Sequence, residues 1–199
     1  MSKISLEPNS SGSGTFTLAA PNSNTNRTLT LPDASGNIIA ADASTGRFDS
    51  SNMPAGSVIQ VVTAEKTDVF SSSKGAPFTD VPGLSVSITP QNANSQFLII
   101  LSLHGSSDGS NFQPFTYRIA KNGSAVLAHS SGVGGIQGVE SLSTTGSGVS
   151  VALDSPSTSG TVTYSAQVKG EANTINKVNE SINGNINTAS SITVVEIAG

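Results

Sequence analysis

The sequence has no cysteine and no tryptophan, and only 11% of its 199 residues are charged. Without cysteine the chain cannot form a disulfide, a thiolate metal site or a cysteine nucleophile. Long hydrophobic runs are missing too, because the longest, Phe97–Leu101, is far shorter than the roughly 20 residues that span a bilayer. Met1–Ser13 lacks the apolar core of a signal peptide, so we expect synthesis in the cytoplasm and no membrane insertion.

Positive charge is scarce and scattered. Nine basic residues are dispersed among 13 acidic ones, and the net charge is −4. Proteins that bind nucleic acid carry clustered lysine and arginine, often together with aromatic side chains. The sequence has no such cluster, so a nucleic-acid partner is not expected.

Serine, threonine, asparagine and glycine, by contrast, supply about 90 of the residues. Threonine, valine and isoleucine recur in short alternating runs between turn-forming residues, which is typical of many short strands, and no segment has a sustained helical period. The predicted fold class is all-β, with an N-terminal extended β segment followed by an antiparallel β-sandwich or jelly roll of about eight or nine strands. The clearest expected strands lie at 58–63, 84–88, 96–103, 115–120, 125–128, 161–168 and 192–197.

Two segments of this region carry more specific predictions. Gln96–Leu103 is apolar on both faces, with Leu98 and Ile100 opposite the other apolar residues, so we expect a central strand that is covered on both sides. Asn122-Gly123 lies between two strand-like runs. It predicts a two-residue β-hairpin, because a type I′ turn needs positive φ at both positions.

The first fifty residues differ from the rest. Thr15–Leu18 and Thr28–Leu31 are two copies of a T-x-T-L pattern. Because a two-stranded unit is marginal in water, we expect these copies to pack against sister chains; the alternative is a disordered tether. Small and polar residues through 41–56 indicate a linker. The predicted organisation is an N-terminal segment 1–50, a linker 51–56 and a head 57–199.

Several of these motifs resemble the fibre proteins of tailed phages, especially cyanobacterial and marine phages. The resemblance covers both ends and much of the middle of the chain. It implies a particle-proximal shaft at the N-terminus and a head similar in outline to trimeric jelly rolls of the tumour necrosis factor type. The matching segments are Gly14–Pro21, Asn26–Ile38, Ser57–Val62, Val81–Pro90 and Ser190–Ile197.

The resemblance therefore implies a homotrimeric virion protein that binds other virion proteins through its N-terminus and contacts a host surface glycan or protein through its head. The expected anchoring residues are Phe16, Leu18, Leu29, Leu31 and Ile38. Phe97, Ile99, Leu101 and Leu103 are candidates for a trimer core, or alternatively for the interior of a single sandwich. The stretches 105–111 and 130–149 are expected to be loops at the tip, with Ser107, Asp108, Asn111 and Ser131 as host-contact candidates.

No catalytic, cofactor-binding or metal-binding residues are assigned. A metal site needs at least three converging ligands, whereas His104, Asp108 and His129 are too few and are expected in surface loops. No G-x-S-x-G elbow is present, and no motif brings two carboxylates together as sugar-cleaving enzymes require. We expect a non-enzymatic tail fibre that attaches to the host; a capsid head fibre or decoration protein is the first alternative, and a polysaccharide-degrading spike is the second.

Overall fold

The computed structural model describes residues 10–15, 17, 22–26, 28, 33, 53–109, 115–126, 135–136, 143–169, 174–181 and 188–199. The chain divides into two units, Met1–Ile38 and Ile39–Gly199. All strands of the described residues lie in the second unit, and the first of them begins at Val58. The expected boundaries at residues 50 and 56 stay predictions, because residues 34–52 lie outside the described ranges.

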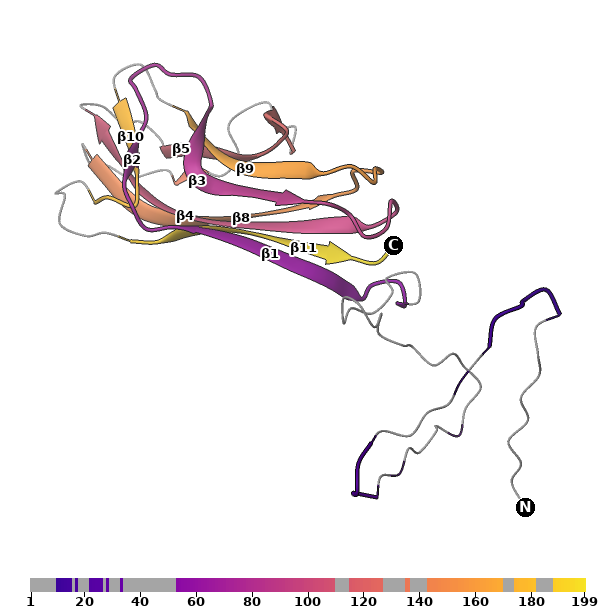
Figure 1. The fold of residues 1–199 in the computed structure, drawn as a ribbon. Coiled ribbons are helices and arrows are strands. Elements are labelled where there is room, and N and C mark those ends of the chain that lie inside the picture. Colours follow the sequence, from indigo (N-terminus) through magenta and orange to yellow (C-terminus); the bar gives the residue numbers. More distant parts are fainter. Residues whose placement is uncertain are drawn as a thin grey trace. The chain divides into compact units, whose positions relative to one another are not determined.

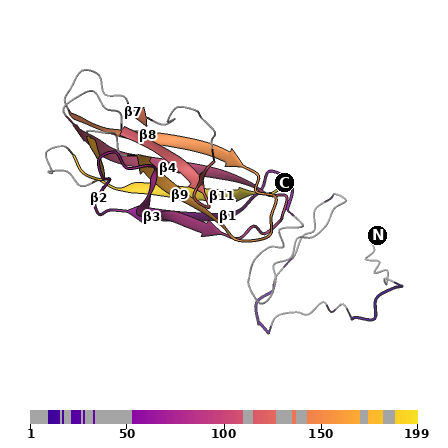
Figure 2. The same cartoon turned by 90° about the horizontal axis from the view of Figure 1, so that it is seen from above.

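The second unit is an all-β sandwich of two antiparallel sheets, drawn as two layers in Figure 1 and seen from above in Figure 2. The first sheet has the order β1-β11-β4-β10-β2, and β8 pairs with the free side of β4; the second has the order β3-β9-β5-β6, and β7 pairs with β5. Over the described residues no helix is long and apolar enough to cross a membrane. The strands are β1 (Val58–Lys66), β2 (Phe70–Ser71), β3 (Thr79–Ile88), β4 (Gln96–Gly109), β5 (Phe115–Lys121), β6 (Ser124–Ala125), β7 (Gly135–Ile136), β8 (Ser143–Asp154), β9 (Val162–Lys169), β10 (Thr174–Val178) and β11 (Ser190–Ile197).

The core lies between the two sheets. Successive side chains of a strand point to opposite faces, and here alternate residues of β11, of β4 from Phe97 to Leu103 and of β3 from Leu84 to Ile88 are buried. Phe97 of the first sheet meets Tyr164 of the second edge-to-face, with ring centroids 5.9 Å apart. The Tyr164 hydroxyl donates a hydrogen bond to Asp154 of β8 at 2.7 Å, and burial together with this bond raises the pKa of Tyr164. Aromatic packing and a buried hydrogen bond thus join the sheets.

The predicted hairpin is confirmed. Lys121 of β5 pairs with Ser124 of β6, which leaves Asn122 and Gly123 as the two loop residues. Their φ angles are +48° and +82°, a region that asparagine tolerates and that glycine adopts without steric cost. The turn residues therefore fix the register of this hairpin.

The two ends of the sandwich are formed by different parts of the chain. At one end the chain leads into β1 beside the C-terminus, where Gly56 and Ala198 share a backbone hydrogen bond of 2.8 Å. Figure 1 shows the C-terminus at this end. At the opposite end Lys66 pairs with Ser190, and β10 and β2 extend the first sheet. We call these the proximal end and the far end.

The predicted strand at 96–103 is confirmed, with β11 and β8 as its neighbours, but its outward side, with Leu98 and Ile100, is not fully covered within one chain, and two loop predictions are wrong in part. β4 continues to Gly109, because its glycine and serine residues stay paired with β8 on one side and β10 on the other. Residues 143–149, expected at the end of a long loop, belong to β8. Backbone hydrogen bonds to neighbouring strands can hold a strand that has few apolar side chains, so composition alone wrongly predicts loops for both segments.

Candidate functional site

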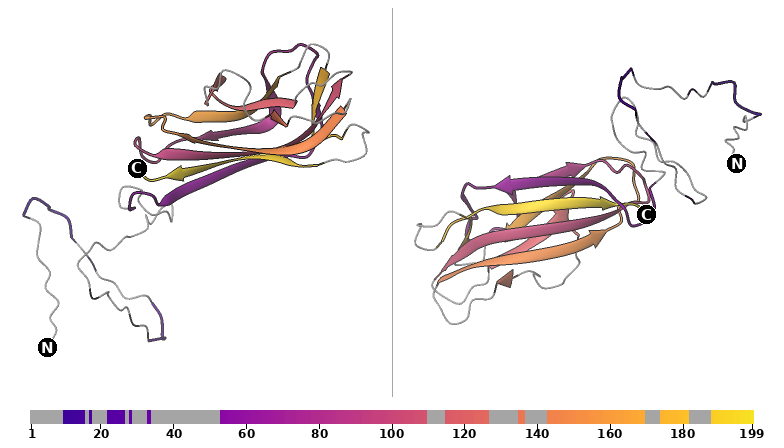
Figure 3. Two further views of the ribbon diagram at one scale, coloured as in Figure 1. Left: turned by 180° about the vertical axis from the view of Figure 1, so that it is seen from behind. Right: turned by 90° about the horizontal axis from the view of Figure 1, so that it is seen from below.

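The outward side of the first sheet is apolar. Along four adjacent strands the register aligns Val61, Val195, Leu98 and Leu153 in one row, and Thr63, Thr193, Ile100 and Val151 in the next. The right panel of Figure 3 looks onto β1, β11, β4 and β8 side by side. We define the outer apolar face as Val58, Val61, Leu98, Ile100, Val149, Val151, Leu153, Val195 and Ile197.

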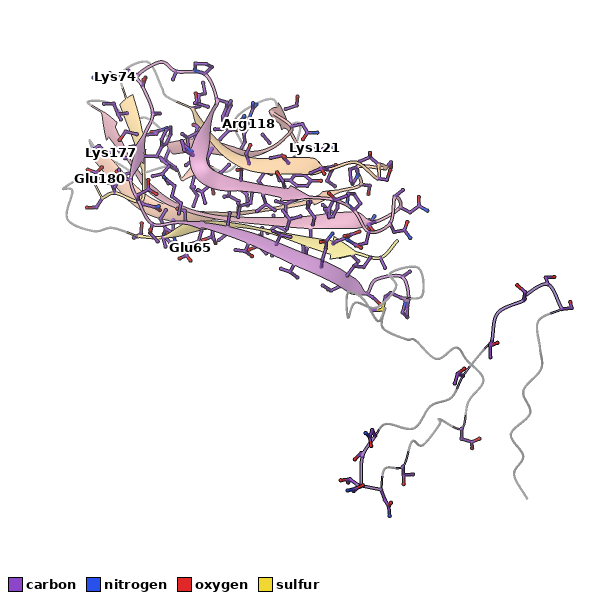
Figure 4. The ribbon with its side chains drawn as sticks, viewed as in Figure 1. Glu65, Lys74, Arg118, Lys121, Lys177 and Glu180 are labelled. Carbon is purple, nitrogen blue, oxygen red and sulfur yellow. The ribbon has the colours of Figure 1, made fainter. Side chains whose placement is uncertain are left out.

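This face is open to solvent in the single chain. Val58, Val61, Val149, Val151 and Leu153 are between 55% and 64% exposed. Its rim is polar. Glu65 is the one charged residue among the described outward residues of β1 from Val58 to Glu65 and of the residues aligned with them on β11, β4 and β8. Figure 4 shows Glu65 on the β1 side of the sandwich, away from Arg118 and Lys121. Contiguous apolar surface inside a polar rim is typical of a protein–protein interface.

A pocket lies beyond the far end of this face, where the strand that borders β4 changes. β11 pairs with β4 up to Ser102, and β10 takes over at Gly105. Leu103 and His104 lie between these two pairings, so no strand residue is paired with His104 on that side, and β8 borders it on the other. The pocket has a volume of about 150 Å³ and is lined by His104, Gly105, Gly146, Ser147, Glu180, Ser181 and Thr188.

The floor of the pocket is held by β4 and β8. His104 and Ser147 are direct partners in the strand register, and Ser147 Oγ is hydrogen-bonded to His104 Nδ1. Gly105 turns its Cα toward the interior, where an added Cβ would lie 2.6 Å from the Phe115 ring. Glycine at this position lets the backbone sit directly over a core aromatic ring.

The wall of the pocket is organised by Asn179, which is fully buried and has a φ of +61°. Its amide donates to the carbonyl oxygens of Lys66 and Asp68 at 2.7 and 3.1 Å. Its Oδ1 accepts a hydrogen bond from the Ser190 hydroxyl at 2.6 Å, and Ser190 in turn accepts the backbone N–H of His104 at 2.9 Å. One asparagine therefore connects the ends of β1, β4 and β11 behind the pocket.

The ionic groups beside the pocket are paired with each other. Lys177 Nζ lies 3.0 Å from Glu180 Oε1, and Figure 4 shows both residues at the far end. At the edge of the same end, the hydrogen bond from Lys66 holds the pKa of Asp68 below its usual range. The charged groups described beside the pocket therefore compensate each other.

Within the described residues, no third group orients the histidine of the Ser147–His104 pair in the pocket. Serine activation needs a histidine that is itself oriented by a third group. Among the described residues Ser147 is the side-chain partner of His104, and Glu180 is bonded to Lys177. The described part of the chain also holds no cluster of three or more His, Cys, Asp or Glu that could bind a metal ion.

The residues predicted from sequence fall into three groups. The anchoring candidates Phe16, Leu18, Leu29, Leu31 and Ile38, and the host-contact candidates Asn111 and Ser131, lie outside the described residues, as does His129. Ser107 and Asp108 belong to β4 and not to a loop. Ser107 is 3% exposed, so its assignment as a host contact is wrong, and His104 likewise lies on a strand.

The third group needs a different correction. Phe97, Ile99, Leu101 and Leu103 are fully buried between the two sheets of one chain. They leave no surface for a neighbouring subunit, so the trimer-core assignment is wrong for them and the interior of a single sandwich is correct. The other face of the same strand, with Leu98 and Ile100, belongs to the outer apolar face.

Sequence reasoning missed Val149, Val151 and Leu153, which contribute most of the exposed apolar surface of β8. Their alternation with Ser150 and Ala152 was the available signal. No protein-family model matches the chain, and no curated protein is found to be similar to it. The function has to be inferred from the outer apolar face and the pocket.

Proposed function

We propose that this chain is a non-enzymatic structural protein of a tailed-phage particle, a short fibre whose N-terminal segment anchors it and whose β head assembles into a homotrimer. The observation that carries the proposal is the outer apolar face, which a single chain leaves uncovered. The fibre-like motifs of the N-terminal fifty residues support the assignment to a virion. The head would then present its far end to the host surface.

The size and chemistry of the outer apolar face support self-association. Four strands about 4.8 Å apart and about seven residues long give a face of roughly 450 Å². The largest apolar patches on monomeric proteins have a similar area and are often functional. An apolar face of this area could also form the centre of an interface that covers about 800 Å² per partner. A face without opposing charges gains most from a partner that is equally apolar, so we assign a second and third copy of this chain to it.

Threefold symmetry fits the width of the face. Three sheets of about 19 Å width, arranged as a triangular prism, place each sheet about 5.5 Å from the axis; half the usual distance between packed sheets is about 5 Å. The side chains would fill the interior of such a prism without a channel. The arrangement also brings β8 of one subunit against β1 of the next, and both are outermost strands of the apolar face. Unpaired strand edges, which otherwise invite aggregation, would be covered.

Sedimentation equilibrium of the full chain tests the assembly. We expect about three times the chain mass of 20.0 kDa. A mass near 20 kDa at micromolar concentration would contradict the trimer, and a mass near 40 kDa would show that two faces pack as a pair.

Attachment is tested on particles. Antibody labelling of virions is expected to mark the tail, and labelling of the shell instead would identify a capsid fibre. Removal of residues 1–50 is expected to leave an assembled head that no longer joins particles. Continued incorporation of that shortened chain would contradict the anchoring role.

A further inference from the structure

The pocket at the far end has no role in the assembly proposed above. Its floor row, His104 and Ser147, lies beyond the last apolar row of Ser102 and Val149. It is built from three separate parts of the chain: buried Asn179, next to Glu180, donates its backbone N–H to the His104 carbonyl oxygen, and Gly146 and Ser147 are paired with Gly105 and His104 in the sheet. We propose that this pocket binds a single neutral sugar ring, such as one unit of a polysaccharide.

The volume of the pocket selects a ligand of one ring. A cavity of about 150 Å³ is the size that accepts one six-membered ring, and the pocket has that volume. Ligand sites for drug-sized molecules usually measure about 300 Å³ or more. A long chain of sugars would therefore place one unit in the pocket and leave the others outside.

The polar groups of the pocket suit hydroxyl groups of a ligand. Ser147 and Thr188 each offer a hydroxyl, which both donates and accepts hydrogen bonds. His104 has its Nδ1 bonded to Ser147, and no described residue bonds its Nε2. A ring with neighbouring hydroxyl groups can bond to the Thr188 hydroxyl, to His104 Nε2 and to the remaining hydrogen-bonding capacity of Ser147, whereas a purely apolar ring would offer these groups no partner.

The charge of the pocket selects a neutral ligand. Glu180 is the one carboxylate among the lining residues, and Lys177 lies 3.0 Å from it. A phosphate or carboxylate would meet Glu180 with no uncompensated cation nearby among the described residues, and a cation would find the carboxylate already paired. An uncharged hydroxylated ring meets neither penalty.

The position of the pocket agrees with a contact at the exposed end of a fibre. It lies at the end opposite Gly56 and the C-terminus, about 25 Å along β1 at roughly 3.3 Å per residue. As a host contact this inference rests on the proposed function; as a binding site it does not. If three chains assemble through their outer apolar faces, three such pockets surround one end of the axis, and weak single sites would then act together.

The test uses the full chain and four probes: the methyl glycosides of glucose, galactose, mannose and N-acetylglucosamine. Saturation-transfer NMR detects the bound probe, and titration of the His104 imidazole proton signals measures its affinity. We expect saturable binding of at least one probe in the millimolar range. Ser147→Ala is expected to weaken that binding roughly three- to tenfold, which is the usual net value of one hydrogen bond.

Ser87→Ala is the matched control. Ser87 lies on the other sheet from the pocket and is also an outward serine with a side-chain hydrogen bond, to Thr163 of the adjacent strand β9, and its removal is expected to leave the affinity unchanged. The inference is overturned if no probe shifts the His104 signals, or if binding survives both Ser147→Ala and His104→Ala. Sedimentation is read in parallel, so a monomer that still binds the probe refutes the trimer alone, and a trimer that binds none refutes the pocket alone.

Discussion

The two outward faces of the sandwich have opposite chemistry. The outward side of the second sheet carries hydroxyl, amide and charged groups that bond to one another. Ser87 and Thr163 are 2.8 Å apart, Asp80 accepts hydrogen bonds from Ser165 and Gln167, and Arg118 lies over the Phe78 ring. On the first sheet most of the corresponding positions hold valine, leucine and isoleucine, with the hydrogen-bonded pair Thr63 and Thr193 among them and a polar rim around them.

The difference shows which outward face has its side chains satisfied within one chain and which leaves apolar surface exposed to water. A polar face whose side chains satisfy each other gains little from a partner, because a partner would have to replace those hydrogen bonds. An apolar face of similar extent gains from every partner that removes it from water. Both sheets bury the same kind of residues inside, so their outward sides alone decide which one is suited to assembly.

A charge placed on the apolar face gives the largest expected effect. Val151 is 55% exposed in the single chain, so Val151→Lys is expected to fold normally. In a trimer it would bury three lysines close to the axis, each at a cost of several kcal/mol. Association is expected to weaken at least about 100-fold, and sedimentation equilibrium would then give the mass of a single chain.

Ser87→Lys provides the comparison on the other face. Ser87 is an outward residue of β3, an outermost strand of the second sheet, as Val151 is of β8. This change is expected to leave the trimer intact. If both lysine variants keep the trimer, or both lose it, the two faces do not differ in the way proposed.

The second prediction compares leucine-to-alanine substitutions in the interior and on the outer apolar face. Leu101 is fully buried and Leu153 is 56% exposed. Leu101→Ala is expected to lower the free energy of unfolding by about 2–5 kcal/mol, because it leaves a cavity in the core. Leu153→Ala is expected to lower it by less than about 1 kcal/mol in the dissociated chain and to weaken association instead.

Urea denaturation at low concentration and sedimentation at several concentrations measure the two quantities separately. A loss of unfolding free energy for Leu153→Ala as large as that for Leu101→Ala would mean that the outer face is already covered within the single chain. The outer apolar face would then need a different definition.

Part of this contrast could be predicted from the sequence. The alternation of valine and serine in β3, and the apolar residues on both sides of β4, correctly predicted one amphipathic strand and one central strand. Asn122-Gly123 predicted its hairpin for a local reason, the positive φ of both residues. These features depend on residues that are close together in the sequence, so they can be predicted from the sequence.

The apolar face itself could not be predicted, because β8 reverses the usual pattern. Val149, Val151 and Leu153 point outward, while Gly148, Ser150 and Ala152 point inward. Gly148 faces the Tyr117 side chain, whose hydroxyl occupies the place where a Cβ would lie. The interior is filled by a residue of the other sheet, and alternation alone does not tell which side of β8 is inside.

The pocket could not be predicted for a related reason. Its floor comes from residues 104–105 and 146–147, and its wall from Glu180, Ser181 and Thr188. The gap exists because β11 stops pairing with β4 at Ser102 and β10 begins at Gly105. Such a change of neighbouring strand depends on how strands that are distant in the sequence pair with each other, so no local motif predicts it.

The smallest effect compares one threonine on each face. Thr193 shares a hydroxyl hydrogen bond of 3.0 Å with Thr63 in the middle of the apolar face, and Thr163 shares one with Ser87 on the polar face. In an assembled trimer Thr193→Val would leave the Thr63 hydroxyl buried without its partner, so association is expected to weaken by about 1 kcal/mol. Thr163→Val leaves Ser87 in water and is expected to change association by less than about 0.3 kcal/mol.

The double variant Thr63→Val/Thr193→Val sharpens this comparison further. Because it removes both hydroxyl groups, no buried polar atom remains unpaired, and association is expected to return to the wild-type value or exceed it. Sedimentation equilibrium of the two single variants and the double variant gives the coupling between Thr63 and Thr193. A double variant weaker than Thr193→Val alone would mean that water still reaches this row, and that the middle of the outer apolar face is not the centre of the interface.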